Sequence, residues 1–565
     1  MTGPGRSGAR PPASVWALVA ILLLALALRL KGIHDPILDH PGWRQGDTAA
    51  IARNFATLDY NPLHPQTDYD GPPPNYVELE LQIVPFVAAT LYKIFGLHEI
   101  FGRLISLGFS LLNVALLYAF AGWLFGRPGR RNEVAGLGAA LTFALYPGSI
   151  YYGRTFMPDT AMVCLATAAV YAAARWIVDD GGTWGSRLRT AGIVTALAIL
   201  AKPVAAVVLV PIFAALLARG GPRVLLRPAT WAFAALALAP YLAYDAYLRS
   251  IAEWHWASAI ASKHVVPELR AAFTSPAALG AKFGLFGNAL GMLGSTMLGP
   301  AGLALLVLAL VTPVRARSRA ILWGWLGGAV LYAFVVVTVE KVDYYLYLVL
   351  PLAALWSGGL AARVADFVAE RPGARVLAAI AGCATLAAIG WTGHVALRPY
   401  YRYNPDVYRR AVALDARLAP GALVVMAHYD PSVLYYIRRK GWEEDPSLWT
   451  PFDEESAIRK GARYFIAIED RRLRRNVELC HWLERFPLLD PNAAWPVYVT
   501  DPARVLPGAE ARWKAFRKLE AAGASQPCPL RNLKAPTEGA AANLRTPPPN
   551  RRFPAPNPTR PNAGS

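Results

Sequence analysis

The chain has 565 residues, of which 55% are hydrophobic and only 17% are charged. Ordinary soluble proteins carry about 25% charged residues, so this composition excludes a typical soluble protein and indicates a large lipid-facing surface. The net charge of +19 does not indicate nucleic acid as a partner, because the basic residues cluster in short loops between apolar runs and form no basic and aromatic stripe.

Apolar runs recur from Val15 to Trp391, and a helix of about 20 apolar residues crosses a hydrocarbon core about 30 Å thick. The first run predicts a retained anchor rather than a secretory signal, because Arg29-Leu30-Lys31 ends it and no clear cleavage site follows. Lys202-Pro203 separates two short runs, since proline lacks a backbone donor. About eleven passes are expected, at residues 14–30, 104–125, 134–150, 160–178, 190–201, 204–218, 231–248, 291–311, 320–338, 344–362 and 376–392.

Basic residues in the short loops predict the orientation of these passes. One set of loops carries two or three basic residues each, whereas the alternate loops carry a single one: Arg154, Lys202 and Lys341. We therefore expect a cytoplasmic N-terminus, residues 1–13, and an extracytoplasmic C-terminus. Two longer loops then lie outside, at residues 31–103 and at about residues 249–290.

The region after the last pass predicts a small extracytoplasmic α/β domain over residues 398–507. It contains a helical stretch at Asp406–Leu418, apolar strands at Ala422–Ala427 and Tyr464–Ile468, and a helix start at Asp453. Residues 508–565 are expected to be mostly disordered, because the chain beyond Gly523 is rich in Pro, Asn, Ala and Arg. Cys480 and Cys528 are able to pair in an oxidising compartment, and the sequence leaves open whether they do.

Two acidic residues on the outer side are candidates for chemistry. Asp47 follows Trp43-Arg44-Gln45-Gly46, and Asp159 follows Met157-Pro158 at the start of a pass. Each has two interpretations: a helix cap or first-turn residue, or a carboxylate that takes a proton from an acceptor group. Both map to the membrane face that also carries Glu340, and charges at the ends of passes are costly unless they reach water or serve a site.

Three isolated cations on the same face, Arg154, Lys202 and Lys341, suit a substrate that carries phosphate. The alternative is that each reaches from the bilayer to the interface. No glycine-rich phosphate loop or dinucleotide fingerprint is found, which argues against a nucleotide substrate. His255 lies between Trp254 and Trp256, which fit an interfacial aromatic belt or substrate stacking. No histidine pair has zinc spacing, so no metal and no cofactor is predicted.

Several of these stretches together resemble the GT-C glycosyltransferases, in particular the aminoarabinose lipid A transferases and protein O-mannosyltransferases. The matching stretches run in order over about residues 14–400, from Trp43-Arg-Gln-Gly-Asp47 and Glu78-Leu-Glu80 through Tyr152-Gly-Arg154…Met157-Pro-Asp159 and Ala201-Lys202-Pro203 to Lys341-Val-Asp-Tyr-Tyr345. One departure concerns Asp70-Gly71, which stands where the lipid A transferases carry a Glu-Lys pair. A phosphate-binding lysine at that place is therefore not expected.

The resemblance implies a mainly α polytopic GT-C fold with the transmembrane domain at residues 14–397 and a catalytic loop at residues 31–103. It implies an inverting transferase that moves a hexosyl or pentosyl group from a polyprenyl-phosphate carrier to a lipid, glycan or protein acceptor outside the cytoplasm. Asp47 and Asp159 are the implied catalytic residues. The implied donor-binding residues are Arg154, Lys202, Lys341 and Tyr345, and the acceptor or supporting residues are Arg44, Glu78, Glu80 and His255.

Two other classes of protein remain as alternatives: a flippase for lipid-linked saccharides, and a non-catalytic envelope-assembly protein. A flippase is expected to carry charges along a path through the bilayer and pseudo-repeated halves, whereas the polar residues here gather at one face. The Arg- and Ala-rich composition favours the inner membrane of a bacterium. The other expected partners are membrane lipids, and no nucleic acid is expected.

Overall fold

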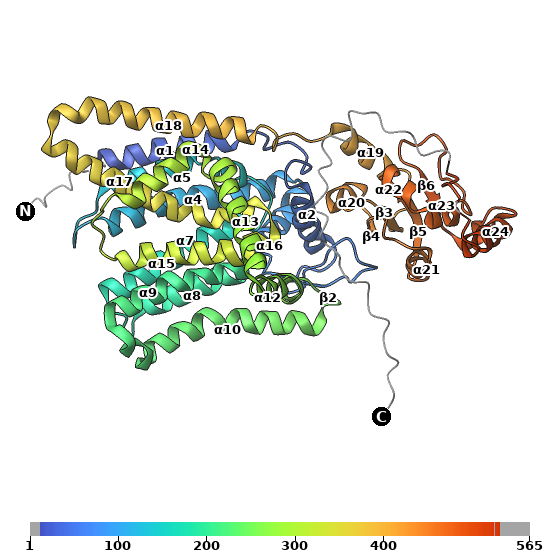
Figure 1. The fold of residues 1–565 in the computed structure, drawn as a ribbon, viewed down its shortest axis with the longest axis horizontal. Helices are drawn as coiled ribbons and strands as arrows, with labels where there is room; N and C mark the ends of the chain where they lie inside the picture. Colours follow the sequence, from blue (N-terminus) through green and yellow to red (C-terminus); the bar gives the residue numbers. More distant parts are fainter. Residues whose placement is uncertain (1–11, 525, 531–565) are drawn as a thin grey trace, which may run out of the picture.

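The computed structural model describes residues 12–524 and 526–530. A bundle of long helices forms one part of the molecule, and a smaller unit containing a β-sheet caps one end of it (Figure 1). The first eleven residues and the end of the expected C-terminal tail lie outside the described residues.

Ten of the eleven expected passes coincide with one helix or with consecutive helical segments, and the pass at residues 291–311 coincides with α14 only in part. The helical segments are α1 (Ala13–Arg29), α4 (Ile100–Leu124), α5 (Glu133–Leu145) with α6 (Pro147–Tyr152), α7 (Asp159–Asp179), α8 (Ser186–Ala201), η1 (Pro203–Val208) with α9 (Leu209–Gly220), α10 (Pro228–Ile251), α14 (Gly299–Val311), α15 (Arg319–Tyr332) with η5 (Ala333–Val337) and α16 (Thr338–Glu340), η6 (Asp343–Val349) with α17 (Leu350–Glu370), and α18 (Arg375–Leu397). Among the described residues, six helices are long and apolar enough to cross a membrane, or up to seven if one bent pair is a single span. The count of about eleven therefore stays a prediction.

The bent pair corrects the expected pass at residues 291–311. α13 (Pro276–Met292) and η4 (Leu293–Met297) form one apolar helix, which meets α14 at 113°. Gly299 lies at the break with a φ of +72°, a left-handed conformation that glycine adopts without a steric penalty. The second outer loop is accordingly shorter than expected, since α13 takes up the stretch from Pro276.

The two outer loops meet at the end of the bundle that carries the C-terminal unit (Figure 1). The first loop contains α2 (Gly42–Thr57), β1 (Val77–Glu78) and α3 (Ile83–Phe95). The second contains β2 (Trp254–His255), α11 (Trp256–Ala259), η3 (Ile260–Val265) and α12 (Val266–Ala272). β1 and β2 pair in parallel, with Glu78 opposite His255, so this pairing joins loops that lie far apart in the sequence.

The C-terminal unit is built on a four-stranded sheet in the order β4-β3-β5-β6, in which only β6 runs antiparallel. The expected strands are confirmed as β3 (Leu423–Ala427) and β5 (Ala462–Ala467), and the expected helices as α19 (Pro405–Asp415) and α21 (Pro451–Arg459). The remaining elements are α20 (Pro431–Ile437), β4 (Lys440–Glu443), α22 (Asp470–Arg475), α23 (Val477–Leu483), β6 (Val497–Val499), η8 (Pro502–Arg504) and α24 (Ala509–Ala521).

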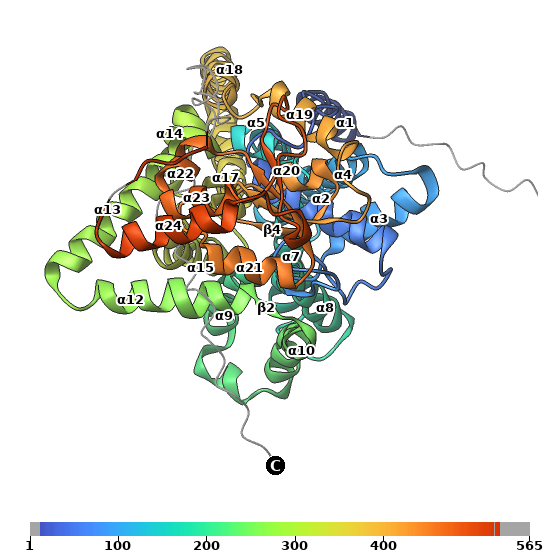
Figure 2. The same cartoon turned by 90° about the vertical axis from the view of Figure 1, so that its right-hand side faces the viewer.

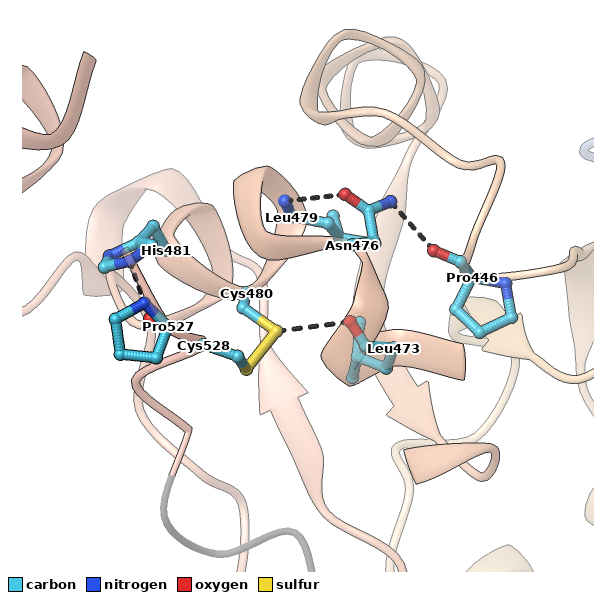
Figure 3. Close-up of a disulfide and its surroundings, with 8 residues drawn as sticks. All are labelled: Pro446, Leu473, Asn476, Leu479, Cys480, His481, Pro527 and Cys528. Atoms are coloured by element: carbon cyan, nitrogen blue, oxygen red, sulfur yellow. Dashed lines mark hydrogen bonds between the residues drawn. A yellow bond between two sulfur atoms is a disulfide. The ribbon is translucent and has the colours of Figure 1, made fainter. Parts of the chain in front are cut away.

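Helix α24 lies in the stretch expected to begin a disordered tail, so the boundary at residue 508 is wrong. The helix is held by ring stacking of His481 on Phe516 and by an ion pair between Arg517 and Glu478. A disulfide joins Cys480 of α23 to Cys528, across 48 residues of sequence (Figure 3). These three contacts fasten the chain after residue 508 back onto α23.

The C-terminal unit packs directly against the first outer loop. A Cβ atom added to Gly46 of α2 would lie 2.5 Å from the Cα atom of Ser432 on α20, so only glycine allows this approach. The Gly71 amide donates to the Gly441 carbonyl at 2.9 Å, and the Lys440 Nζ atom lies 3.0 Å from Asp68 Oδ1. Figure 2, viewed toward this end, shows the unit lying over the helix ends.

Candidate functional site

Asp47 is not a helix cap, so that interpretation of the sequence is wrong. Helix α2 begins at Gly42, and its N-cap residue, Pro41, makes no side-chain cap. Asp47 therefore lies in the second turn, where its carboxylate is buried with 4% of the residue exposed. It is hydrogen-bonded to Tyr69, and its Oδ2 atom lies 3.9 Å from Nη1 of Arg44.

Arg44 joins the acidic residues of this region. Its guanidinium forms an ion pair with Glu80 and also faces Asp47 and Asp159. Burial alone lowers the pKa of Arg44, but the fields of Glu80 and then of Asp47 outweigh it and raise that pKa above its usual value. The structure thus brings three predicted acidic site residues together around Arg44.

Asp159 and Lys202 form the second half of the site. The Lys202 Nζ atom donates to Asp159 Oδ1 at 2.7 Å, and it lies 4.6 Å from the centre of the Tyr345 ring. Tyr344 links the two halves, because its ring contacts both Lys202 and Trp43 of α2. Asp159 is the first residue of α7, so a favourable interaction with the helix dipole accompanies its ion pair.

Arg154 lies elsewhere, in a fully buried network that the sequence analysis missed. Its Nη2 atom donates to Asp39 Oδ2 at 2.6 Å, and Arg103 donates to Asp39 Oδ1 at 2.9 Å. None of Arg154 is exposed. Its guanidinium therefore shares the Asp39 carboxylate with Arg103 and holds the first loop on the bundle, and the structure does not bring it to the Asp47 group.

Glu78 and His255 form a separate group on the paired strands β1 and β2. The Ser258 hydroxyl donates to Glu78 Oε2 at 2.7 Å, and His255 Nδ1 lies 3.8 Å from the same oxygen. Arg249 Nε lies 3.3 Å from Glu78 Oε1. Within residues 12–524 and 526–530, no three His, Cys, Asp or Glu side chains are placed to hold a metal ion.

Lys341 follows α16 in a left-handed conformation with φ of +55°, and its residue is exposed. The neighbouring Glu340 is buried, with its Oε1 atom 3.8 Å from His264 Nδ1. Lys341 precedes η6, the segment that carries Tyr344 and Tyr345. It thus lies at the edge of the site rather than in the Asp159–Lys202 pair.

Two further carboxylates reach the Asp47 region, and the sequence analysis assigned them no role. Burial and the field of Asp47 raise the pKa of Asp70 to about 7. Burial, and then the fields of Asp47 and Asp70, raise the pKa of Glu443 well above its usual value. Glu443 ends β4, so the C-terminal unit supplies part of the site. No local sequence pattern links residues 47 and 443. The one sequence signal in this region was Asp70-Gly71, which stands where the lipid A transferases carry a Glu-Lys pair.

The bundle, the loop helix with its buried carboxylate and the capping C-terminal unit together define a GT-C fold, and the chain is an integral membrane protein of that fold. The sequence model of the family described as dolichyl-phosphate-mannose-protein mannosyltransferase matches residues 82–244. No curated protein sequence matches the chain.

Solved structures of GT-C proteins align with nearly the whole chain. ArnT from Cupriavidus metallidurans, bound to undecaprenyl phosphate, aligns with a TM-score of 0.56 and 13% identity over 88% of this chain and 100% of that chain. The archaeal oligosaccharyltransferase AglB from Archaeoglobus fulgidus, in complex with an inhibitory peptide and a dolichol-phosphate, aligns with a TM-score of 0.52 and 12% identity over 89% and 76%. The resemblance to GT-C glycosyltransferases is therefore confirmed.

Proposed function

We propose that this protein is an inverting glycosyltransferase that moves a sugar from a polyprenyl-phosphate carrier to a lipid, glycan or protein acceptor. The observation that carries the proposal is the burial of Asp47 outside any capping position, beside Arg44 and the Asp159–Lys202 pair. The phosphate carriers bound by ArnT and AglB support the donor class.

In the proposed reaction, an oxygen or nitrogen of the acceptor attacks the anomeric carbon from the side opposite the phosphate. The bond between that carbon and the phosphate oxygen breaks, its electrons leave with the phosphate, and the acceptor proton passes to Asp47. Lys202 stabilises the charge on the leaving phosphate, and Asp159 orients Lys202 through their ion pair. Because the donor is already activated, the reaction needs no nucleotide, and we propose no cofactor.

We place this site on the extracytoplasmic face of a bacterial inner membrane. The Arg-rich loops that favour the cytoplasm lie between α4 and α5 and between α14 and α15, at the ends of those helices away from α2 (Figure 1). The disulfide between Cys480 and Cys528 belongs to the unit at the other end, and disulfides persist in oxidising compartments. Both features support the same orientation.

The test replaces Asp47 with Asn, which preserves the size of the side chain but removes the proton acceptor. We expect normal membrane insertion and melting temperature in Asp47→Asn, with turnover reduced at least about a hundredfold, because general base catalysis contributes about 10²–10⁴-fold. Sugar transfer from a purified polyprenyl-phosphate sugar is the measurement. The control is Asp406→Asn, on the exposed start of α19.

Turnover in Asp47→Asn within about threefold of the wild type would contradict the base assignment, since such a change corresponds to less than 1 kcal/mol of transition-state stabilisation, about the size of ordinary structural effects. Full loss of membrane insertion in the same variant would instead assign Asp47 a folding role.

A further inference from the structure

A cavity of about 430 Å³ is lined by segments at the end of the bundle away from α2 (Figure 1). These segments are the end of α4 with the loop to α5, the last turns of α7, and the loop between α14 and α15. We call this cavity the arginine pocket, because its lining includes Trp123, Arg130, Arg131, Arg175, Asp179 and Arg317. Its volume suits a small ligand group, since ligand pockets measure about 300–1,000 Å³.

The arginine pocket carries an excess of positive charge. Asp179 is the one carboxylate among its described lining residues, and two arginines share it. Arg175 Nε lies 2.6 Å from Asp179 Oδ2, and Arg317 Nη1 lies 3.3 Å from Asp179 Oδ1. Arg130 and Arg131 are exposed, and within the described part of the chain neither forms an ion pair. Their two guanidinium groups are therefore available to an anion.

The wall of the pocket is fixed before any ligand binds. The Arg317 amide donates to the Leu124 carbonyl at 2.8 Å, and Arg317 Nη2 donates to the Arg127 carbonyl at 2.5 Å. The Arg317 guanidinium also lies over the Trp123 ring, 5.2 Å from its centre. These contacts join the α14–α15 loop to the end of α4. A site held in this way loses little conformational freedom when it binds.

The same wall contains a hydrogen-bond donor without an acceptor. Trp123 is buried, and its indole N–H has no hydrogen-bond partner among the described residues. Most buried N–H groups are hydrogen-bonded, because an unpaired one costs free energy. A phosphate oxygen in the pocket would supply the missing acceptor. Guanidinium groups bind phosphate strongly, since their paired N–H groups match its oxygens. Both observations indicate a ligand that carries phosphate.

The helices beside the pocket favour a lipid over a soluble anion. Val134 of α5 follows Arg131 closely in the chain, and Val311 at the end of α14 precedes Arg317; both valines are exposed. The loops that carry the arginines therefore adjoin apolar helix surfaces that face the bilayer. Basic pockets between transmembrane helices, on the side where basic loops gather, bind acidic lipid headgroups.

We propose that the arginine pocket binds the phosphate headgroup of an anionic phospholipid, whose acyl chains lie along the apolar surfaces of α5 and α14. Arg130 and Arg131 contact the phosphate, and the wall with Trp123 faces it. The bound lipid joins three segments of the bundle and thereby stabilises the folded protein. This site lies at the opposite end of the bundle from Asp47, so the inference is separate from the proposed function.

The test measures binding of dioleoyl-phosphatidylglycerol to the purified full-length protein in detergent by native mass spectrometry. The double variant Arg130→Gln/Arg131→Gln should weaken binding about tenfold or more, because it removes hydrogen bonds from charged donors. The matched control, Arg315→Gln/Arg319→Gln, removes two charges at exposed positions that do not line the pocket. The control should bind within about threefold of the wild type. Equal losses in the two double variants would show attraction by the total charge and would overturn the proposal.

A second double variant separates charge from packing. Arg130→Lys/Arg131→Lys keeps both charges and should bind within about fivefold of the wild type. A loss as large as that of the glutamine variant would contradict a role of charge. Phosphatidylglycerol should raise the melting temperature of the wild type and raise that of the glutamine variant much less. Equal increases in the two proteins would place the lipid outside the pocket.

Competition identifies the source of the phosphate. Dioleoyl-phosphatidylcholine, which has the same chains but no net charge, should displace phosphatidylglycerol only weakly, and so should inorganic phosphate. Equal binding of phosphatidylcholine would refute recognition of an anionic headgroup. Displacement by inorganic phosphate at equal concentration would assign the pocket to a soluble anion and refute the lipid. No step uses a sugar donor, so these results leave the proposed function untouched, and a failure of sugar transfer leaves this site standing.

Discussion

Two carboxyl groups beside Asp47 have raised pKa values. Asp70 has a pKa of about 7, because it is buried and because Asp47 lies near it. Burial, and then the fields of Asp47 and Asp70, also raise the pKa of Glu443 well above its usual value. Adjacent carboxyl groups in a buried site do not all ionise together. A proton held by one of these groups therefore relieves the repulsion that three negative charges would cause.

This arrangement predicts a pH dependence of stability. An unfolded Asp releases its proton near pH 4 and folded Asp70 only at about pH 7, so the folded state holds the extra proton between these values. Stability from Asp70 is therefore complete below about pH 4 and decreases as the pH rises to about 7. The melting temperature of the wild type should fall over this range, and Asp70→Asn should show a smaller fall.

Melting curves of both proteins at pH 5, 6, 7 and 8 in one detergent measure the difference. Asp366→Asn, at an exposed position near the end of α17, should follow the wild type. Parallel curves for the wild type and Asp70→Asn would contradict the raised pKa of Asp70.

At the scale of elements, the packing of α2 against α20 positions the site. Gly46 lies one residue before Asp47 and touches the α20 backbone at Ser432, so the position of Asp47 depends on how closely these helices approach. Gly42 lies one turn earlier on the same helix. A Cβ atom added to Gly42 would lie 3.5 Å from the Ser432 Oγ atom, which is ordinary van der Waals contact. The two glycines thus differ in the space around them but share one helix.

Gly46→Ala should separate α2 from α20, because the added methyl group would overlap backbone atoms that have no alternative rotamer. Overpacking of this kind costs about 1–3 kcal/mol, so we expect the melting temperature to fall by several degrees and sugar transfer to decrease. Gly42→Ala should change neither quantity measurably. Equal melting temperatures for the two variants would show that α20 can shift away from α2 without loss of stability and does not constrain the position of Asp47.

The sequence predicted individual elements better than their contacts. Apolar runs located the helices of the bundle, and the strands β3 and β5 followed from short apolar stretches. Helix α13 was assigned to a loop, because it is rich in glycine and follows the polar residues of the second outer loop. The start of α2 was missed by a full turn, since Pro41 and Gly42 carry no side-chain capping signal.

The site was predicted only where its residues lie in one local stretch. Asp47 with Arg44, and Lys202 before its proline, could be selected from the sequence. The partners Asp39, Asp70 and Glu443 could not, because their roles arise from contacts between distant segments. The partner of Arg154 could not be predicted for the same reason: a lone cation at the end of a pass gives no indication that a buried aspartate pairs with it.

At the scale of the whole molecule, the orientation in the membrane decides which compartment contains the site. A reporter that is active only in the cytoplasm should be fused after Leu530, so that α24 and the disulfide remain intact. We expect this fusion to be silent and a fusion after Arg130, between α4 and α5, to be active. An active fusion after Leu530 would reverse the orientation and overturn the extracytoplasmic reaction.

The contribution of Glu443 to the Asp47 region has a consequence for biosynthesis. Residue 47 is translated and inserted long before β4 leaves the ribosome, since synthesis proceeds at about 5–20 residues per second and domains fold in order. During that interval the first loop helix faces the outside without its C-terminal neighbour. A nascent or truncated chain that ends before β4 therefore holds an incomplete carboxylate cluster, and only the full-length polypeptide assembles it.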